Sequence, residues 1–184
     1  MKSQSQLELH VAELRQLFNA MDPAPFRERD LDPNAEQYIV DWAREARTDG
    51  PLSLLVHVGG GAATPANTRM LGDAVHEHFR RLAVGTRQRL RQLFRTGRIS
   101  LLIGLAFVAI ASLAAEYFGG LITRGSTSSF VTDSLAIGAW VALWRPLEIF
   151  LYDWWPIRSE ARLQDRLGEM DVRLVDAGAQ VRPA

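Results

Sequence analysis

The sequence predicts a membrane α-helical hairpin of two transmembrane helices, together with a small cytoplasmic α/β domain and amphipathic terminal helices. Two long apolar runs, at residues 99–122 and 130–157, predict the hairpin, since a bilayer core of roughly 30 Å needs about 20 helical residues. One alternating segment between two helical patterns predicts the α/β domain. Arginines near the ends of the apolar runs predict the orientation.

The residue totals conceal a division along the chain. The 184 residues are 47% hydrophobic, and their formal net charge of zero gives no sign of a nucleic-acid partner. The chain has no cysteine, which excludes disulfides and thiolate catalysis and fits a reducing compartment. The polar start MKSQSQLELH lacks the apolar core of a signal peptide, so the apolar runs are expected to act as insertion signals.

Residues 1–21 are interpreted as an amphipathic helix. Their apolar residues follow one another in steps of four and three, which places them on one helical stripe; they are Leu7, Val11, Leu14, Phe18 and Met21. The proline-rich residues 22–25 end this helix, because proline lacks the amide donor.

Residues 22–86 are interpreted as the small cytoplasmic α/β domain. Residues 26–31 are a short, charged candidate for an edge strand. Asp32-Pro33 and Thr64-Pro65 each place a capping residue before a proline at the first helical position, which predicts two helix starts. Between these helices, residues 52–58 alternate as a half-buried strand does. The predicted sheet has only about two strands, and such sheets are marginal alone.

The rest of the chain follows from the two apolar runs. Residues 87–98 form a basic juxtamembrane helix, residues 99–122 and 130–157 the two spans with a possible kink at Pro146, residues 123–129 an extracytoplasmic turn, and residues 158–184 a cytoplasmic C-terminal helix and tail. The tail helix carries apolar residues at heptad-like spacing and is a possible partner for the N-terminal helix; they are Leu163, Leu167, Met170 and Leu174.

The distribution of arginine sets the predicted orientation. Eight arginines flank the spans on the side of the termini, against Arg124 alone in the turn, so the positive-inside rule predicts an inner (cytoplasmic) membrane protein with both termini in the cytoplasm. The eight are Arg87, Arg89, Arg91, Arg95 and Arg98 before the first span and Arg158, Arg162 and Arg166 after the second. Buried core helices of a soluble protein would need more polar chain to cover them.

The segment WRPLEIFLYDWWP, residues 144–156, carries a resemblance. It resembles a motif shared by a widespread group of uncharacterised bacterial two-span membrane proteins. The likeness also touches residues 22–33 and covers about a third of the chain at motif level. This resemblance implies the two-span topology and no activity.

The same segment contains a predicted intramembrane polar stripe of Arg145, Glu148, Tyr152 and Asp153. A charged side chain within a span costs about 2.5–3.5 kcal/mol, and a partner three residues on relieves part of that cost. Three interpretations remain open. The stripe lines a proton or ion path, or Arg145 and Glu148 lock helices together, or Pro146 ends a short span and residues 147–155 lie in the membrane interface.

Small and acidic residues supply further candidates within the spans. Glu116 and Asp133 are expected near the outer end, where they either bind a cation together or are simply hydrated. A row of small residues in the first span, continued by two on the second, permits close helix packing; these are Ala111, Ala115, Gly119, Ser134 and Gly138.

The soluble part offers weaker candidates. Gly59, Gly60 and Gly61 between a strand and a helix suggest either a phosphate-binding loop or a flexible connection, and the loop lacks the lysine of a P-loop. His76 and His78 are two residues apart on a helix, so they are not expected to share a metal. His57 is expected to face solvent or to be covered by a neighbour.

These patterns predict no catalytic residues, no metal site and no cofactor. We therefore expect a two-pass protein that is not an enzyme, whose partners are the lipid bilayer and further copies of itself in a homo-oligomeric assembly or scaffold. The alternative is a small ion or proton channel or transporter component that uses the stripe of Arg145, Glu148 and Tyr152.

Overall fold

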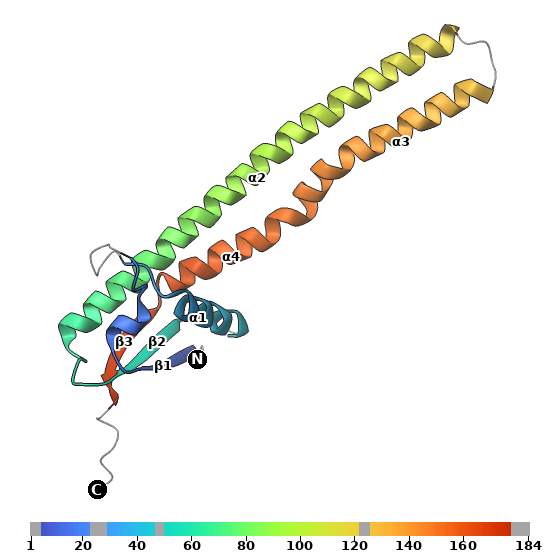
Figure 1. Cartoon of the computed structure of the whole chain (residues 1–184). Helices are drawn as coiled ribbons and strands as arrows, with labels where there is room; N and C mark the ends of the chain where they lie inside the picture. Colours follow the sequence, from blue (N-terminus) through green and yellow to red (C-terminus); the bar gives the residue numbers. More distant parts are fainter. Residues whose placement is uncertain (1–4, 23–28, 47–49, 122–125, 178–184) are drawn as a thin grey trace. The chain divides into compact units, whose positions relative to one another are not determined.

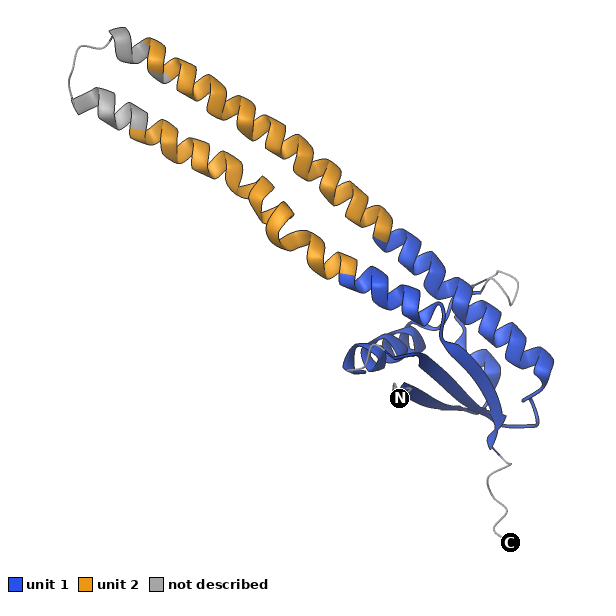
Figure 2. Cartoon of the chain, turned by 180° about the vertical axis from the view of Figure 1, so that it is seen from behind, with its two compact units in different colours: residues 1–86, 159–184 blue, residues 87–158 orange. Residues whose placement is uncertain are grey.

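The computed structural model describes residues 5–22, 29–46, 50–121 and 126–177. Figure 1 shows the chain, which divides into two compact units. The first unit comprises residues 1–86 and 159–184, and the second comprises residues 87–158 (Figure 2). One helix, α2 (Pro65–Leu121), begins in the first unit and ends in the second, as its unbroken helical pattern predicts.

The first unit contains a parallel three-stranded sheet in the order β1-β2-β3. The central strand β2 (Leu52–Val58) is the predicted one, and it pairs with β1 (Ser5–Val11) on one side and with β3 (Asp171–Asp176) on the other. The predicted sheet of two strands is thus a sheet of three, with both added strands coming from the ends of the chain.

Both predicted terminal helices require correction. Residues 5–11 of the predicted N-terminal helix are strand β1, followed by the short 3-10 helix η1 (Leu14–Leu17). The predicted C-terminal helix ends at Leu167 in α4 (Trp154–Leu167), and Leu174 lies in β3. Leu7, Leu9 and Val11 alternate as in a strand, whereas Leu7, Val11 and Leu14 also fit the spacing of a helix. The pairing of residues 5–11 with β2 makes this segment a strand.

The predicted helix starts are confirmed. Helix α1 (Pro33–Glu45) begins at a proline, and Asp32 Oδ1 accepts a 2.9 Å hydrogen bond from the amide of Asn34. Helix α2 begins at Pro65, and Thr64 Oγ1 accepts a 3.2 Å bond from the amide of Asn67. These caps satisfy amides that the first helical turn leaves without backbone partners. Of the candidate strand at residues 26–31, residues 26–28 lie outside the described residues, and the rest is no strand of the sheet, since Leu31 forms only an isolated antiparallel bridge with Phe18.

The core of the first unit lies between the sheet and the helices. It joins strand residues such as Leu54 and Val56 to Ile39 of α1, Phe79 of α2 and Leu167 of α4, all of which are almost completely buried. Two successive right-handed crossovers that move in one direction along a parallel sheet place their helices on one face. Helices α1, α2 and α4 accordingly contribute to one shared core.

The second unit is a pair of long helices. It contains the later part of α2, then α3 (Ser126–Glu148), the π-helical segment η2 (Ile149–Asp153) and the start of α4. Two helical segments, Pro65–Ala114 and Asp133–Leu167, are long and apolar enough to cross a membrane. The predicted kink at Pro146 corresponds to a proline inside α3, three residues before η2. Of the predicted turn at residues 123–129, residues 123–125 lie outside the described part, and residues 126–129 are not a turn but the first residues of α3.

Candidate functional site

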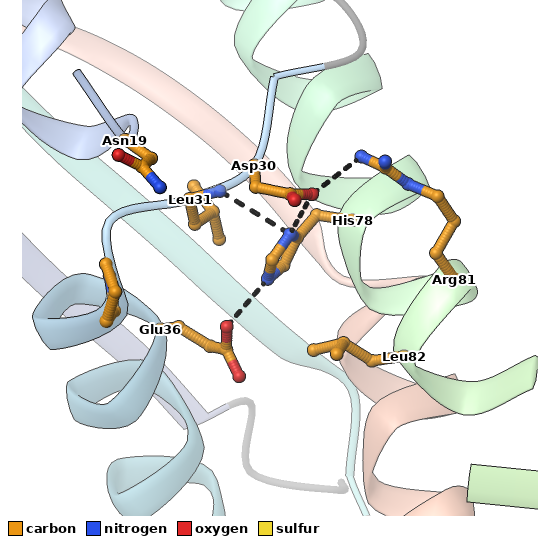
Figure 3. Close-up of a pocket in the computed structure, with 8 residues that line it drawn as sticks. Asn19, Asp30, Leu31, Glu36, His78, Arg81 and Leu82 are labelled. Atoms are coloured by element: carbon orange, nitrogen blue, oxygen red, sulfur yellow. Dashed lines mark hydrogen bonds and ion pairs between the residues drawn. The ribbon is translucent and has the colours of Figure 1, made fainter. Parts of the chain in front are cut away.

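The most connected polar cluster in the first unit centres on His78 of α2 (Figure 3). Its side chain is almost fully buried, with Nε2 3.0 Å from Glu36 Oε2 on α1 and Nδ1 3.2 Å from Asp30 Oδ1. Arg81 Nη2 lies 3.0 Å from the same Asp30 oxygen, and the amide of Leu31 lies 3.4 Å from Nδ1. The cluster therefore ties the segment before α1, α1 itself and α2 to one imidazole.

The His78 cluster borders an open cavity of about 370 Å³. Both ring nitrogens are already occupied by protein groups, so neither is left to take a proton from a bound molecule. The neutral ring accepts from the Leu31 amide, whereas the charged ring donates to Asp30. This arrangement suits a clamp that holds the connection between β1 and α1 against α2 in either protonation state.

A second histidine cluster lies on the sheet. His57 of β2 stacks on His10 of β1, with ring centroids 4.3 Å apart and planes within 8°, and His57 Nε2 lies 3.7 Å from Glu8 Oε2. Of the two positions expected for His57, the solvent-facing one is wrong, because the residue is 2% exposed. The other is confirmed, because the ring of His10 covers it. Parallel rings direct their lone pairs in parallel rather than to one point, which disfavours a shared metal.

The loop of Gly59, Gly60 and Gly61 after β2 is followed by an amide that already binds a carboxylate of the protein. Gly60 and Gly61 adopt φ values of 75° and 70°, which favour glycine because a Cβ would crowd the backbone. The amide of Ala63 in this loop donates a 3.1 Å hydrogen bond to Asp176 Oδ1 at the end of β3. A carboxylate of the protein thus takes one of the amides on which phosphate binding would depend, which favours the structural interpretation.

The second unit contains the predicted pairing of Arg145 and Glu148, with Nη1 2.8 Å from Oε2. Asp153 joins them, with Oδ2 3.5 Å from the same nitrogen. The side chains of Arg145, Glu148 and Asp153 are 62%, 42% and 31% exposed, so the cluster lies on the surface of the hairpin. It combines one positive with two negative charges.

The π-helical segment η2 explains how Asp153 reaches Arg145. In a regular helix of 3.6 residues per turn, residues eight apart point about 80° away from each other. A π turn holds about one residue more than an α turn, which rotates the following residues back. The five residues of η2 stand between Glu148 and Trp154 and thereby bring Asp153 to the face of Arg145.

The contacts between the two helices show which part of α2 lies opposite the cluster of Arg145, Glu148 and Asp153. A Cβ added to Gly97 of α2 would lie 2.9 Å from Ile149 Cγ2, and the rings of Phe94 and Phe150 lie 6.1 Å apart. Gly97 stands between Arg95 and Arg98, the last arginines before the apolar run. The cluster is therefore level with the basic segment of α2 rather than with the middle of that run.

Glycines form the closest contact between the two helices. A Cβ on Gly104 would lie 3.0 Å from the carbonyl oxygen of Ala142. In a regular helix that oxygen accepts from residue 146, but Pro146 has no amide hydrogen. Gly97, Gly104 and the buried Ala111 recur every seven residues, a spacing that keeps one side of α2 against its neighbour.

The other predicted packing residues have varied positions. Gly138 of α3 faces Phe107, 3.6 Å from where its Cβ would be, whereas Ser134 is exposed. Tyr152 of the predicted polar stripe is exposed, as is Arg145. Ala115 and Gly119 belong to α2, but their side chains lie outside the described part.

Glu116 and Asp133 are both exposed on their helices. Within the described residues, no group of three or more histidine, cysteine, aspartate or glutamate side chains is arranged to hold a metal ion.

The sequence interpretation missed the acidic partners of His78, the stacking of His10 and the roles of Gly97 and Gly104. The heptad spacing of Gly97, Gly104 and Ala111 was a visible signal for the last of these. The histidine contacts join strands and helices far apart in the chain and had no local signal.

Comparison of the chain with family models, with curated proteins and with solved structures gives no match.

Proposed function

We propose that this chain is a two-pass protein of the bacterial inner membrane that assembles with copies of itself as a membrane scaffold. The observation that carries the membrane part is the exposure of its apolar helices. Only 17% and 11% of the most apolar windows of the two candidate spans are buried. A core helix of a soluble protein would be mostly buried, whereas lipid accepts apolar side chains on every side.

The orientation in this proposal follows from the ends of the hairpin. The arginines of residues 87–98 are at the level of Arg145 and its carboxylates, and Trp144, Tyr152 and Trp155 are exposed near them. Tryptophan and tyrosine favour both membrane interfaces, and an excess of arginine marks the cytoplasmic one. This level supports the interpretation in which the second span ends near Pro146 and the following residues lie in the interface.

Self-assembly is supported by the small sheet of the first unit. Three strands are close to the minimum for an independent sheet, and both edge strands are short. All described helices that share the core contribute to one face of the sheet. A second copy of the chain could pack against the edge strands and against the sheet face opposite the helices. The proposal assigns no reaction, since the His78 cluster leaves neither ring nitrogen free.

The test of this proposal combines topology with size. A reporter that is active only outside the cytoplasm should give a signal when inserted after Thr127 and none when fused to either end. The detergent-solubilised protein should show several copies per particle in mass photometry. An external signal from the C-terminus would reject the hairpin, and a single copy at all protein concentrations would reject the assembly.

One observation favours the alternative of an ion or proton path. The cluster of Arg145, Glu148 and Asp153 holds one more carboxylate than cations, and an unbalanced carboxylate is a typical proton carrier. The variant Asp153→Asn in reconstituted vesicles separates the two functions. A path loses proton flux in this variant, whereas a scaffold shows no flux in either protein.

A further inference from the structure

One face of the three-stranded sheet carries exposed residues on both edge strands, whereas Ser53 and His57 of the central strand are buried. The strand residues in the core belong to one side of the alternation, namely Leu7, Leu9, Val11, Leu52, Leu54, Val56, Val58, Val172 and Leu174. The residues between them point to the opposite face, because successive side chains in a strand alternate. No described helix contributes to a core on that side.

The register of the strands gives the layout of this open face. Its three rows run across the strands in the order β1, β2, β3. They are Gln6, Ser53 and Asp171, then Glu8, Leu55 and Arg173, then His10, His57 and Val175. The middle row thus has a negative residue on one edge strand, an apolar one at the centre and a positive one on the other edge strand.

This middle row is complementary to itself under one kind of two-fold symmetry. If two such faces pack with the axis parallel to the strands, β1 of each copy lies over β3 of the other. Glu8 then faces Arg173 of the second copy twice, and Leu55 faces its own equivalent. An axis across the strands places Glu8 over Glu8 instead, which is repulsive.

The side chains are suited to such a contact. Glu8 and Arg173 are both exposed. Arg173 also contacts Asp171 on its own strand at 2.7 Å, but a guanidinium has five donors and so accommodates a further carboxylate.

We propose that a second copy of this chain covers the open sheet face, with the two-fold axis parallel to the strands and Glu8 paired with Arg173 of the other copy. This inference rests on the proposed self-assembly and names its contact surface. Two strands of seven residues and one of six outline roughly 300 Å², less than the about 800 Å² per partner of a typical stable interface. The hairpin must therefore contribute to the assembly, and the test uses the full chain.

Charge reversal tests the pairing directly. Glu8→Arg places two arginines together, and Arg173→Glu places two glutamates together. The dissociation constant of the assembly should therefore rise about tenfold or more in each single variant. The double variant should assemble like the wild type. Because the pairing runs between copies, a mixture of the two single variants should also assemble, although neither does so alone.

Glu45→Arg and Arg44→Glu serve as matched controls, since both residues are exposed on α1 and lie off the open face. These variants should assemble normally. A circular dichroism melt of each variant separates loss of assembly from loss of fold. Normal assembly of both single variants, or failure of the mixture to assemble, overturns the proposed pairing.

The absence of cysteine allows a second measurement. Leu55→Cys places one thiol on the proposed axis, and a short bifunctional maleimide spans the about 10 Å between packed sheets. Cross-linked dimers should form with Leu55→Cys and not with Glu45→Cys. If the protein is oligomeric yet Leu55→Cys gives no dimer, another protein or another surface occupies the face; if the protein is monomeric, the proposed self-assembly itself fails.

Discussion

The two units use apolar side chains in opposite ways. In the first unit, Leu71, Val75 and Phe79 of α2 are almost completely buried against the sheet. In the second unit, Leu102, Ile103 and Ile110 of the same helix are about two-thirds exposed. One continuous helix therefore has a single apolar stripe at its start and exposed apolar residues further along.

The two units also depend on different interactions for their packing. Burial of apolar surface from water stabilises the first unit. In the proposed membrane setting, lipid is as apolar as leucine, so the packing of the two helices in the second unit would depend on close approach at small residues instead. Gly97 and Gly104 are two such positions, where an added Cβ would lie 2.9 Å from Ile149 Cγ2 and 3.0 Å from the Ala142 carbonyl oxygen.

The largest expected effect on stability comes from replacing a buried leucine of the first unit, compared with an exposed leucine of the second. Leu71→Ala should cost about 2–5 kcal/mol of the free energy of unfolding of the first unit, because the deletion leaves a cavity in a packed core. Leu102→Ala should leave that unit's stability unchanged, since its side chain is 67% exposed. Hydrogen exchange of the β2 amides in the detergent-solubilised chain measures both. Equal losses would remove the distinction between the units.

A smaller effect is expected from glycine substitutions along α2. Gly104→Ala should destabilise the hairpin by about 1–3 kcal/mol, because the new Cβ meets the Ala142 carbonyl oxygen at 3.0 Å. Gly85→Ala is the matched control: its Cβ meets no atom within 4 Å, and alanine favours a helix by about 0.5–1 kcal/mol over glycine. Thermal melts in detergent should move in opposite directions for the two variants. A higher melting temperature for Gly104→Ala would refute close packing there.

The smallest effect concerns the charged cluster of the hairpin. Arg145 and Glu148 are largely exposed, so Arg145→Leu, Glu148→Leu and the double variant should each change stability by about 0–1 kcal/mol. A buried pair would lose about 3–5 kcal/mol on removal of one partner. Melting temperature and oligomer mass of the three variants decide between these values. A large loss in the single variants that the double variant restores would indicate that assembly buries the pair.

The sequence predicted the elements whose signals are local. Asp32-Pro33 and Thr64-Pro65 fixed two helix starts, and the alternation of residues 52–58 fixed the central strand. The two edge strands were missed because their apolar residues also fit a helical spacing. Pairing with β2 settles their conformation, and that pairing joins residues far apart in the chain.

The same reason separates the predicted from the unpredicted parts of the candidate sites. Arg145 and Glu148 are three residues apart on one helix, so their pairing follows from spacing. Asp153 joins them because of η2, and a π-helical segment has no simple sequence signal. The contacts of His78 with Asp30 and of His57 with His10 depend on the assembled tertiary structure.

The order of the strands has a consequence for synthesis of the protein. Strand β3 follows β2 by more than 100 residues, and the whole of residues 87–158 is made between them. At about 5–20 residues per second, the ribosome needs on the order of ten seconds to produce the missing strand after β2 has emerged. During that interval β2 has one neighbouring strand instead of two. A nascent chain stopped before β3 therefore leaves an open strand edge, the kind of surface that chaperones and proteases recognise.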